Sequence, residues 1–337
     1  MIIRADYIEK FQCDGKICGS RCCRDWKIFV DDETYKKFLQ ADDSTEILKN
    51  LEQENNSFVL KMTEQGLCKF LDENFLCRLQ KNHGEDFLTA VCQSYPRITY
   101  KLDEEIFQQS MTLTCPVAAK IILLSEEKIN FVEESEIKSR LIINFSKKFF
   151  YSAEKFLQVQ SRAIKILQDR NFSINERLKN LCGLFHKKSS PSFDIEKNSD
   201  ALIKIFDEMY NANLTDEKKK ILRRNYLNNR EKILSQVYEN FSFVFENYLT
   251  NEFFMRCYPC AFVGDDWTNC KIFVTSYRIL EFSLILMTLS KKTLTLEDLI
   301  NLICSVNDKL DHSRGGMNAI KNFAENVDDE KFFSAMI

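Results

Sequence analysis

Beyond about residue 125, apolar residues recur at the spacing of helices. The repeat comprises Ile137, Leu141, Ile142, Phe145 and Phe149, and it returns over 156–167. Because residues three or four positions apart share one face of an α-helix, this pattern predicts amphipathic helices around a core. Further helices are expected over about 199–210, 215–248 and 267–289, and after Thr295, which begins a capping-box pattern with Asp298. The second part of the chain is therefore predicted to be helical.

Shorter apolar runs characterise the first 125 residues. Those at 26–30, 58–62 and 75–79 have strand-like composition, and 98–114 alternates enough for two more strands. Short helices are expected from positions 31, 44 and 116, and a break is expected before Pro96. We predict a mainly α fold. A cysteine-rich N-terminal metal domain with a few short strands (1–125) would precede an all-helical C-terminal domain (126–337).

Composition narrows the class of protein further. The chain has 28 Phe and 11 Tyr against 8 Gly and 4 Pro, which disfavours a fold built from many short strands and turns. The net charge is near −3, so the chain lacks the excess of basic residues that is typical of nucleic-acid-binding proteins. No nucleic-acid partner is therefore expected. The charged start MIIRADYIEK has no apolar secretory segment, and the longest apolar run, 279–289, is short and contains Glu281. We expect a cytoplasmic protein with no membrane partner.

Cysteines are concentrated at the N-terminus. Eight of the 13 lie before position 116: Cys13, Cys18, Cys22, Cys23, Cys68, Cys77, Cys92 and Cys115. In a reducing compartment such a set predicts metal ligation before disulfides, and an iron-sulfur cluster requires several thiolates. No pair of CxxC knuckles is present. The CxxxCxxC motif of radical SAM enzymes is also absent, because Asp25 occupies the position of its third cysteine. Zinc remains an alternative metal, and a set of buried, inert thiols remains a further interpretation.

Two pairs of cysteines are close together in the sequence. Cys22 and Cys23 are adjacent, and in an extended backbone their side chains would point to opposite faces, which predicts different roles. Cys257 and Cys260 form CYPC without a second CxxC, among aromatic residues, which favours a turn packed on a core. The remaining cysteines, Cys182, Cys270 and Cys304, lie on apolar helical faces and are expected to be core residues.

Four N-terminal motifs resemble the flagellin lysine N-methylases, within a broader CxxxCC family that chelates iron or zinc. They are CxxxCC at 18–23 followed by WKI, CKFLDENFLCRLQ at 68–80, CQSYPR at 92–97 and CP at 115–116. The broader family shares the core cysteine pattern. Cys13 and Cys115, by contrast, match the pattern of the methylases more closely than that of the broader family. The resemblance implies a bacterial enzyme that methylates the ε-amino group of lysines on flagellin. It also implies S-adenosylmethionine and an iron-sulfur cluster of the 4Fe-4S type as cofactors.

Methyl transfer to lysine requires a neutral amine aligned with the sulfonium methyl group. Near the cysteines, Asp25 or Tyr95 is a candidate for the group that acts on the lysine, and Arg97 is a candidate for holding a carboxylate. The rival hypothesis is a non-catalytic iron- or zinc-chelating module with a helical interaction domain. The sequence does not indicate an oligomeric state or the residues that bind S-adenosylmethionine.

Overall fold

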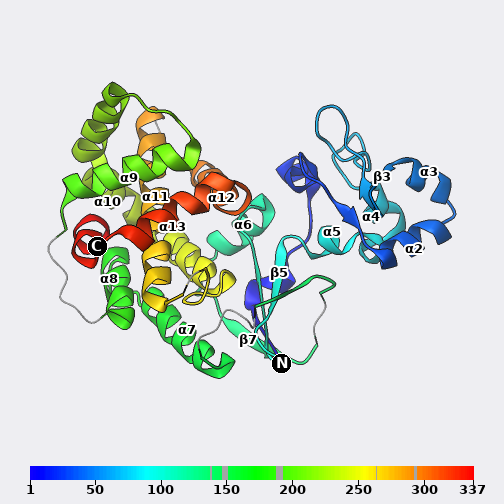
Figure 1. Cartoon of the computed structure of the whole chain (residues 1–337), viewed down its shortest axis with the longest axis horizontal. Coiled ribbons are helices and arrows are strands. Elements are labelled where there is room, and N and C mark those ends of the chain that lie inside the picture. Colours follow the sequence, from blue (N-terminus) through cyan, green and yellow to red (C-terminus); the bar gives the residue numbers. More distant parts are fainter. Residues whose placement is uncertain (137–138, 146–150, 187–192, 263, 292–293) are drawn as a thin grey trace. The chain divides into compact units, whose positions relative to one another are not determined.

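A computed structural model describes residues 1–136, 139–145, 151–186, 193–262, 264–291 and 294–337 (Figure 1). These residues form two compact units. The first comprises Met1–Ala118 and Phe131–Asn144, and the second comprises Ala119–Asn130 and Phe145–Ile337. The predicted boundary at 125 lies within a segment of the second unit, and the chain returns to the first unit after it.

The first unit contains two sheets. The larger has the order β7-β1-β6-β5-β8. Its strands are β1 (Ile2–Ala5), β5 (Arg97–Lys101), β6 (Phe107–Met111), β7 (Phe131–Glu134) and β8 (Ile142–Asn144). Strands β1 and β6 run parallel, as do β5 and β8, whereas β7 and β5 are antiparallel to β1 and β6 respectively. The smaller, antiparallel sheet has the order β2-β4-β3 and contains β2 (Phe29–Val30), β3 (Leu51–Glu54) and β4 (Ser57–Leu60).

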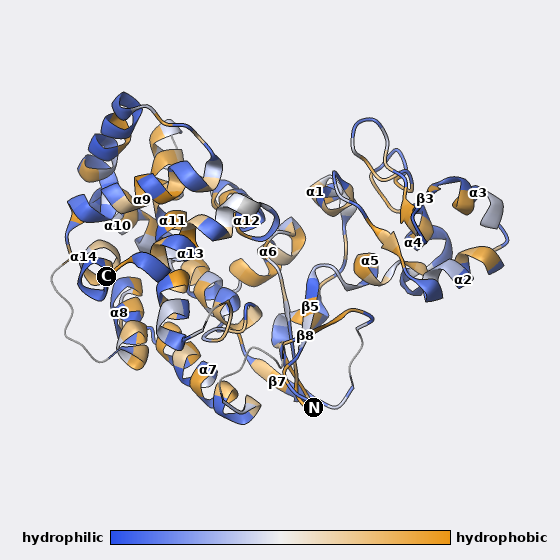
Figure 2. Ribbon diagram, in the orientation of Figure 1, coloured by the Kyte–Doolittle hydropathy of each residue, from blue (hydrophilic) through white to orange (hydrophobic). Residues whose placement is uncertain are grey.

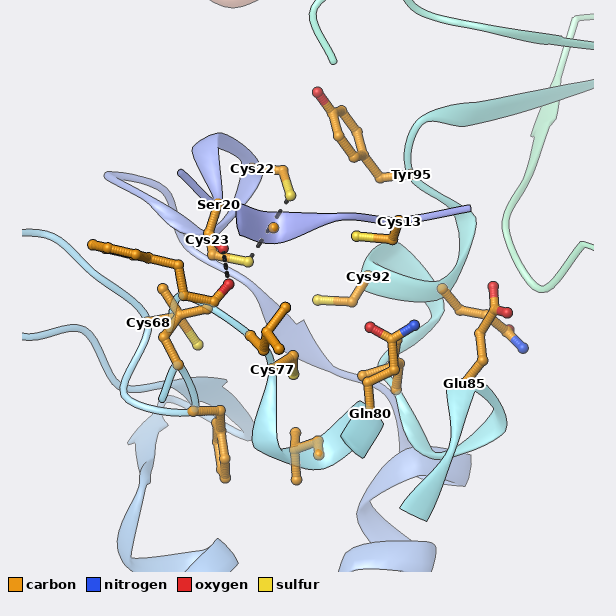
Figure 3. A pocket seen from close by; sticks show the side chains of 18 of the residues that line it. Cys13, Ser20, Cys22, Cys23, Cys68, Cys77, Gln80, Glu85, Cys92 and Tyr95 are labelled. Atoms are coloured by element: carbon orange, nitrogen blue, oxygen red, sulfur yellow. Dashed lines mark hydrogen bonds between the residues drawn. The ribbon is translucent and has the colours of Figure 1, made fainter. Parts of the chain in front are cut away.

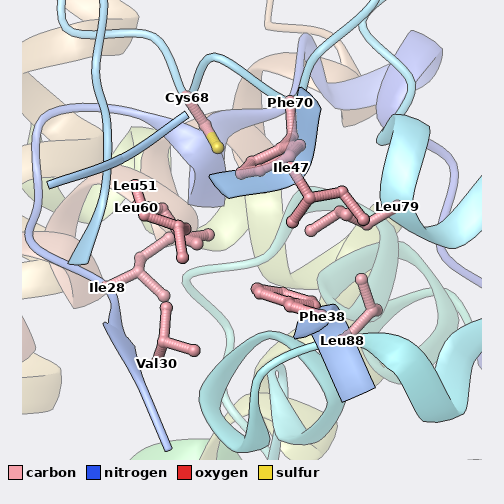
Figure 4. Close-up of a cluster of buried hydrophobic side chains, with 10 residues drawn as sticks. All are labelled: Ile28, Val30, Phe38, Ile47, Leu51, Leu60, Cys68, Phe70, Leu79 and Leu88. Atoms are coloured by element: carbon pink, nitrogen blue, oxygen red, sulfur yellow. The ribbon is translucent and has the colours of Figure 1, made fainter. Parts of the chain in front are cut away.

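Short helices complete the first unit. They are η1 (Asp6–Lys10), α1 (Gly15–Cys18), η2 (Arg21–Cys23), α2 (Asp32–Gln40), α3 (Ser44–Lys49), α4 (Arg78–His83), η3 (Glu85–Phe87) and α5 (Ala90–Ser94), of which η1, η2 and η3 are 3-10 helices. Helix α6 (Pro116–Leu123) begins in the first unit, and most of its residues belong to the second. Phe38 of α2 packs with Ile28, Leu60 and Phe70 in a buried core that also contains Cys68 (Figure 4). The smaller sheet and its helices thus have their own hydrophobic core.

Asp31 joins three segments of the first unit. Its carboxylate caps α2 by accepting hydrogen bonds from the backbone N–H and the hydroxyl of Thr34 (3.0 and 2.9 Å). The same carboxylate accepts from the backbone N–H of Ala90 at 2.9 Å, and Arg140 donates to it at 2.8 Å. The start of α5, which carries Cys92, is thereby fixed to the start of α2.

The described part of the second unit is helical. Its helices are α7 (Ala153–Leu167), α8 (Ile174–Phe185), α9 (Ile195–Tyr210), α10 (Asp216–Met255), α11 (Asp266–Ser290), α12 (Leu296–His312), α13 (Arg314–Asn326) and α14 (Asp329–Met336). Hydrophobic and hydrophilic residues alternate along most of them in Figure 2, as expected for amphipathic helices around a core. The predicted capping box forms at the start of α12, where Thr295 and Asp298 bond each other's backbone N–H groups.

Helix α11 is the centre of the second unit. It contacts α8, α9, α10, α12, α13 and α14, and every residue from Asn269 to Ile285 is buried. By length and composition α11 is the one described helix that could cross a membrane, and 78% of its most apolar window is buried inside the structure. Core helices pass the same test, so this is weak evidence for a membrane span.

The mainly helical fold with strands in the N-terminal region is confirmed, and two local predictions are wrong. The part beyond 126 is not all-helical, because β7 and β8 lie there and pair with β1 and β5. The expected helical face at Leu141, Ile142 and Phe145 therefore includes a strand, while Ile137 and Phe149 lie outside the described residues. The run 75–79 is also not a strand, because Phe75 has a φ of 60° in a turn and α4 begins at Arg78.

Candidate functional site

All eight N-terminal cysteines line one cavity of about 420 Å³ in the first unit. Its walls come from segments 11–28, 68–81, 85–97 and 115–117, together with Leu60. Figure 3 shows the sulfurs of Cys13, Cys23 and Cys92 directed into the same space. The expected cysteines thus share one cavity, while the metal domain predicted from them is not confirmed. Among the described residues, no three His, Cys, Asp or Glu side chains are arranged to hold a single metal ion.

Local structure explains how the N-terminal cysteines reach the cavity. The Asp14 side chain accepts hydrogen bonds from the backbone of Lys16 and Ile17, which starts the single turn of α1 that ends at Cys18. Gly19 follows with a φ of 60°, a conformation that favours glycine, and turns the chain toward η2. Gly15 packs so tightly against Phe75 that an added Cβ would lie 2.3 Å from the Phe75 carbonyl oxygen. This close approach brings segment 11–23 against the loop before Cys77.

The later cysteines are fixed by short elements. The backbone N–H of Cys68 donates to the carbonyl of Cys23 at 2.9 Å. Cys77 directly precedes α4, and Cys92 lies on α5, whose first turn is capped by Thr89. Cys115 precedes Pro116 at the start of α6. Residues separated by up to a hundred positions thus meet without a long regular element.

Cys22 and Cys23 do not point to opposite faces. They lie on the 3-10 helix η2, and their sulfurs are 3.9 Å apart. The argument from an extended backbone is therefore wrong, because the local conformation is a tight turn. These two thiols therefore adjoin each other at the cavity wall.

Burial raises the pKa of several cavity thiols, and neighbouring cysteine charges raise it further. The pKa of Cys92 is raised to about 12, and those of Cys68 and Cys115 to about 11. Although Cys13 is exposed as a residue, desolvation of its sulfur and the charges of Cys22, Cys18 and Cys115 raise its pKa. Since metals bind thiolates, a soft cation entering the cavity would displace these protons. Eight sulfur donors facing one cavity have the chemistry that an iron-sulfur cluster or zinc requires.

The cavity also receives Tyr95 and Arg97 but not Asp25. The Tyr95 hydroxyl is 3.1 Å from the Thr114 hydroxyl, which lies 3.1 Å from that of Thr112, so a hydrogen-bonded chain orients the phenol. Asp25 instead donates its backbone N–H to the Gly66 carbonyl at 2.9 Å. Its carboxylate lies so close to Gly66 that any Cβ there would clash with it.

Glu85 is a cavity residue that sequence reasoning missed. Its carboxylate lies 3.6 Å from the Arg97 guanidinium, which also stacks over the Phe11 ring at 5.1 Å. Arg97 therefore forms an ion pair with Glu85, and its role in catalysis stays a prediction. The eleven residues between Glu85 and Arg97 gave no periodic signal of this pairing, which depends on how η3 and α5 fold.

The five later cysteines are buried in the second unit. The sulfurs of Cys182 and Cys270 lie 4.0 Å apart within the core, and the Cys260 sulfur lies 3.5 Å from the Tyr151 hydroxyl. Cys257 and Tyr258 are buried in the turn after α10, with Tyr258 packed on Phe253 and Phe273. The interpretation of CYPC as a turn packed on an aromatic core agrees with this geometry.

The helical fold and the cysteine-lined cavity define a class of protein that combines a thiol-rich pocket with a large helical unit. A family model of the FliB lysine N-methylase C-terminal domain matches residues 184–336, within the second unit. The flagellar biosynthetic protein FliU of Salmonella muenchen is 30% identical over 147 residues, which cover 41% of this chain and 85% of that protein. The chain belongs to the flagellin lysine N-methylase family.

Two longer relatives carry the name of an activity. The lysine-N-methylases of Salmonella typhimurium and Salmonella choleraesuis are 32% and 31% identical over 142 residues, or 39% of this chain. The matched region spans only 35% of each of these two proteins. No solved structure matches the chain.

Proposed function

We propose that this protein transfers a methyl group from S-adenosylmethionine to the ε-amino group of lysines on flagellin. We further propose that the N-terminal cysteines hold an iron-sulfur cluster, of the 4Fe-4S type, on which this activity depends. The observation that carries the proposal is the cavity lined by eight cysteines together with Tyr95 and Arg97, in a chain that belongs to this family. The names of the relatives, two lysine-N-methylases and a flagellar biosynthetic protein, support the reaction and the flagellar substrate.

The reaction sets clear demands on the site. The carbon–sulfur bond of the sulfonium breaks as the lysine nitrogen forms a bond to the methyl carbon, and S-adenosylhomocysteine leaves. The attacking amine must first be neutral, so the site has to accept a proton from the ammonium form and limit its hydration. When bound, an iron-sulfur cluster supplies redox chemistry, and its ligands would come from the eight cavity cysteines.

The non-cysteine residues of the cavity suit a lysine side chain. Phe11 and Tyr95 provide apolar surface for an aliphatic stem, and Glu85 provides a carboxylate for the ammonium group. The hydrogen bond between the Tyr95 and Thr114 hydroxyls holds the phenol, which makes Tyr95 the better candidate for orienting the amine. Arg97 would hold Glu85 in place. Asp25 stays a candidate with weaker support, because it does not line the cavity.

The decisive experiment uses the full chain purified without oxygen. It is incubated with purified flagellin and S-adenosylmethionine carrying an isotopically labelled methyl group, and mass spectrometry of flagellin peptides locates the label. We expect label on lysine nitrogen. Tyr95→Phe should lower kcat by about 10²-fold or more if the hydroxyl takes part in proton transfer, whereas Tyr100→Phe on β5 is the matched control.

Failure has a specific meaning. If the protein binds S-adenosylmethionine but labels another protein in place of flagellin, the substrate is wrong and the enzyme class stands. If it binds metal but neither binds S-adenosylmethionine nor transfers methyl groups, the non-catalytic iron- or zinc-chelating module is the correct function. Colour separates the metals, because an iron-sulfur protein absorbs broadly in the visible range and a zinc protein is colourless.

A further inference from the structure

Large apolar side chains are exposed at the edge of the cysteine cavity. Trp26 and Phe75 line the cavity, yet each is 39% exposed to solvent. Ile17 lies on the single turn of α1, between residues that line the cavity, and is 60% exposed. We call these three residues, together with Arg24, which stacks over the Phe75 ring, the cavity rim.

The backbone that carries the rim is held in place on both sides. The Ser20 hydroxyl donates to the Phe75 carbonyl, and Gly15 packs closely against the same carbonyl. The indole N–H of Trp26 donates to the Cys22 carbonyl, which fixes the orientation of the ring. Because these side chains are already ordered, a ligand that binds to them loses little conformational freedom of the protein. The rim therefore has the properties of a preformed binding surface.

Arg24 adds a positive charge to the rim. Its guanidinium lies 5.7 Å from the centre of the Phe75 ring, and its Nε donates to the Gly19 carbonyl at 3.1 Å. Arg24 is exposed, and no carboxylate of the described residues pairs with it, whereas Arg97 in the same cavity is paired with Glu85. An arginine held in this way can pair with a carboxylate that a partner supplies.

Two reactants of the proposed reaction can supply a carboxylate: S-adenosylmethionine and an acidic side chain of the protein substrate. Sites for small molecules enclose most of their ligand in a concave pocket. The rim is instead exposed, and aromatic and arginine side chains are enriched at protein–protein interfaces. A lysine that enters the cavity also brings its neighbours in the chain against the rim. These features favour the protein substrate as the ligand of the rim.

We propose that the cavity rim selects which lysines of the substrate are methylated. Its three apolar residues bind an apolar side chain next to the target lysine, and Arg24 binds a neighbouring aspartate or glutamate. The inference rests on the proposed function, which places the lysine in this cavity, and it names the class of substrate segment: a lysine flanked by an apolar and an acidic residue. Arg24 is thus a residue that determines specificity and takes no part in methyl transfer.

The test measures binding separately from methyl transfer. Two fluorescent synthetic peptides of equal length contain a single lysine, which is flanked by leucine and glutamate in one and by serine and glutamine in the other. Fluorescence anisotropy measures their binding to the full chain, purified without oxygen. We expect the leucine–glutamate peptide to bind about 10-fold more tightly, because aromatic and arginine contacts dominate protein interfaces. This preference should fall as the salt concentration rises, since Arg24 is exposed.

Variants assign the preference to the rim. Ile17→Ser should weaken binding of the leucine–glutamate peptide by about 5-fold. Arg24→Gln should make this peptide bind no better than a leucine–glutamine peptide, and Arg24→Glu should reverse the preference toward a leucine–arginine peptide. Leu39→Ser and Lys36→Gln are the matched controls, because both residues are exposed on α2 and neither lines the cavity. Circular dichroism reports the folding of each variant.

Several outcomes overturn the inference. They are no binding of any peptide, equal affinity for all of them, and a preference that Ile17→Ser and Arg24→Gln leave unchanged. If Arg24→Gln raises KM for S-adenosylmethionine and leaves peptide binding unchanged, Arg24 binds the cofactor instead. Selective peptide binding without methyl transfer refutes the proposed function alone, and methyl transfer to flagellin lysines regardless of their neighbours refutes the inference alone.

Discussion

The two units use the same side chain in opposite ways. In the first unit eight cysteines face a shared cavity, and desolvation and their mutual charges raise the pKa of most of them. In the second unit the five cysteines are buried in the helical core, where a thiol serves as a small apolar side chain. The number of cysteines is therefore a poor guide to their role, and what decides it is whether the fold directs several sulfurs into one space.

The two units also differ in where they place paired charged side chains. The second unit buries ion pairs in its core, such as Arg278 with Glu281 and Arg177 with Glu246. In the first unit, the cavity pair of Arg97 and Glu85 is partly exposed, with the Glu85 side chain 53% accessible. The buried ion pairs thus stabilise the packing of the helical unit, while the partly exposed pair in the cavity can still bind a ligand.

The largest effect is expected from a cysteine contrast. Cys68→Ala should remove the bound metal and lower the stability of the first unit, because a structural metal contributes directly to folding. Cys304→Ala, the matched change in the second unit, should leave metal content unchanged. Metal analysis and thermal unfolding measure both. Equal metal loss in the two variants would show general unfolding and would erase the distinction between the units.

A buried ion pair gives the next effect. Arg278 is 1% accessible and donates to Glu281, to Asn175 and to the Met336 carbonyl. Arg278→Met should lower the free energy of unfolding by about 3–5 kcal/mol, because Glu281 would be left buried without its cation. Denaturant titration measures the loss, and the double variant Arg278→Met/Glu281→Leu should recover much of it. A loss that the second substitution does not reduce would assign the effect to packing.

The next prediction concerns the pH dependence of the stability that Asp31 contributes to the first unit. Although burial raises the pKa of its carboxyl group, hydrogen bonds from Ala90 and Thr34 and the charge of Arg140 lower it below the ordinary 3.8. The ionised form therefore stabilises the fold above that pH, and the contribution is lost as the pH falls through the lower folded-state pKa. Asp31→Asn should cost about 1 kcal/mol at neutral pH, and its difference from wild type should narrow in acid. A difference that is constant from pH 7 to below 3 would contradict the assignment.

The smallest effect is expected at the surface of the second unit. Lys197 pairs with Asp194 three residues earlier, but their side chains are 61% and 39% accessible. Lys197→Ala should change the free energy of unfolding by about 0–1 kcal/mol, because solvent screens exposed pairs. The same denaturant titration applies. A decrease in the free energy of unfolding as large as that of Arg278→Met would show that burial does not determine how much an ion pair stabilises this unit.

The sequence by itself determined the features that depend on local spacing. Amphipathic periodicity predicted the helices of the second unit, the Thr295–Asp298 spacing predicted its capping box, and the N-terminal cysteine motifs indicated the family to which the chain belongs. These succeed because a helical face or a cap depends on residues within a few positions of one another. Roles for Asp25, Tyr95 and Arg97, and metal ligation by the cysteines, stay predictions.

Only the tertiary structure decided what lies together. Periodicity could not show that Ile142–Asn144 forms β8, because its partner β5 lies some forty residues earlier, and strand pairing stabilised it against its helical pattern. Nor could spacing show that Cys22 and Cys23 share a tight turn, that Glu85 meets Arg97, or that Asp25 lies against Gly66 and outside the cavity wall. Each of these depends on contacts between distant segments, and such contacts leave no period in the chain.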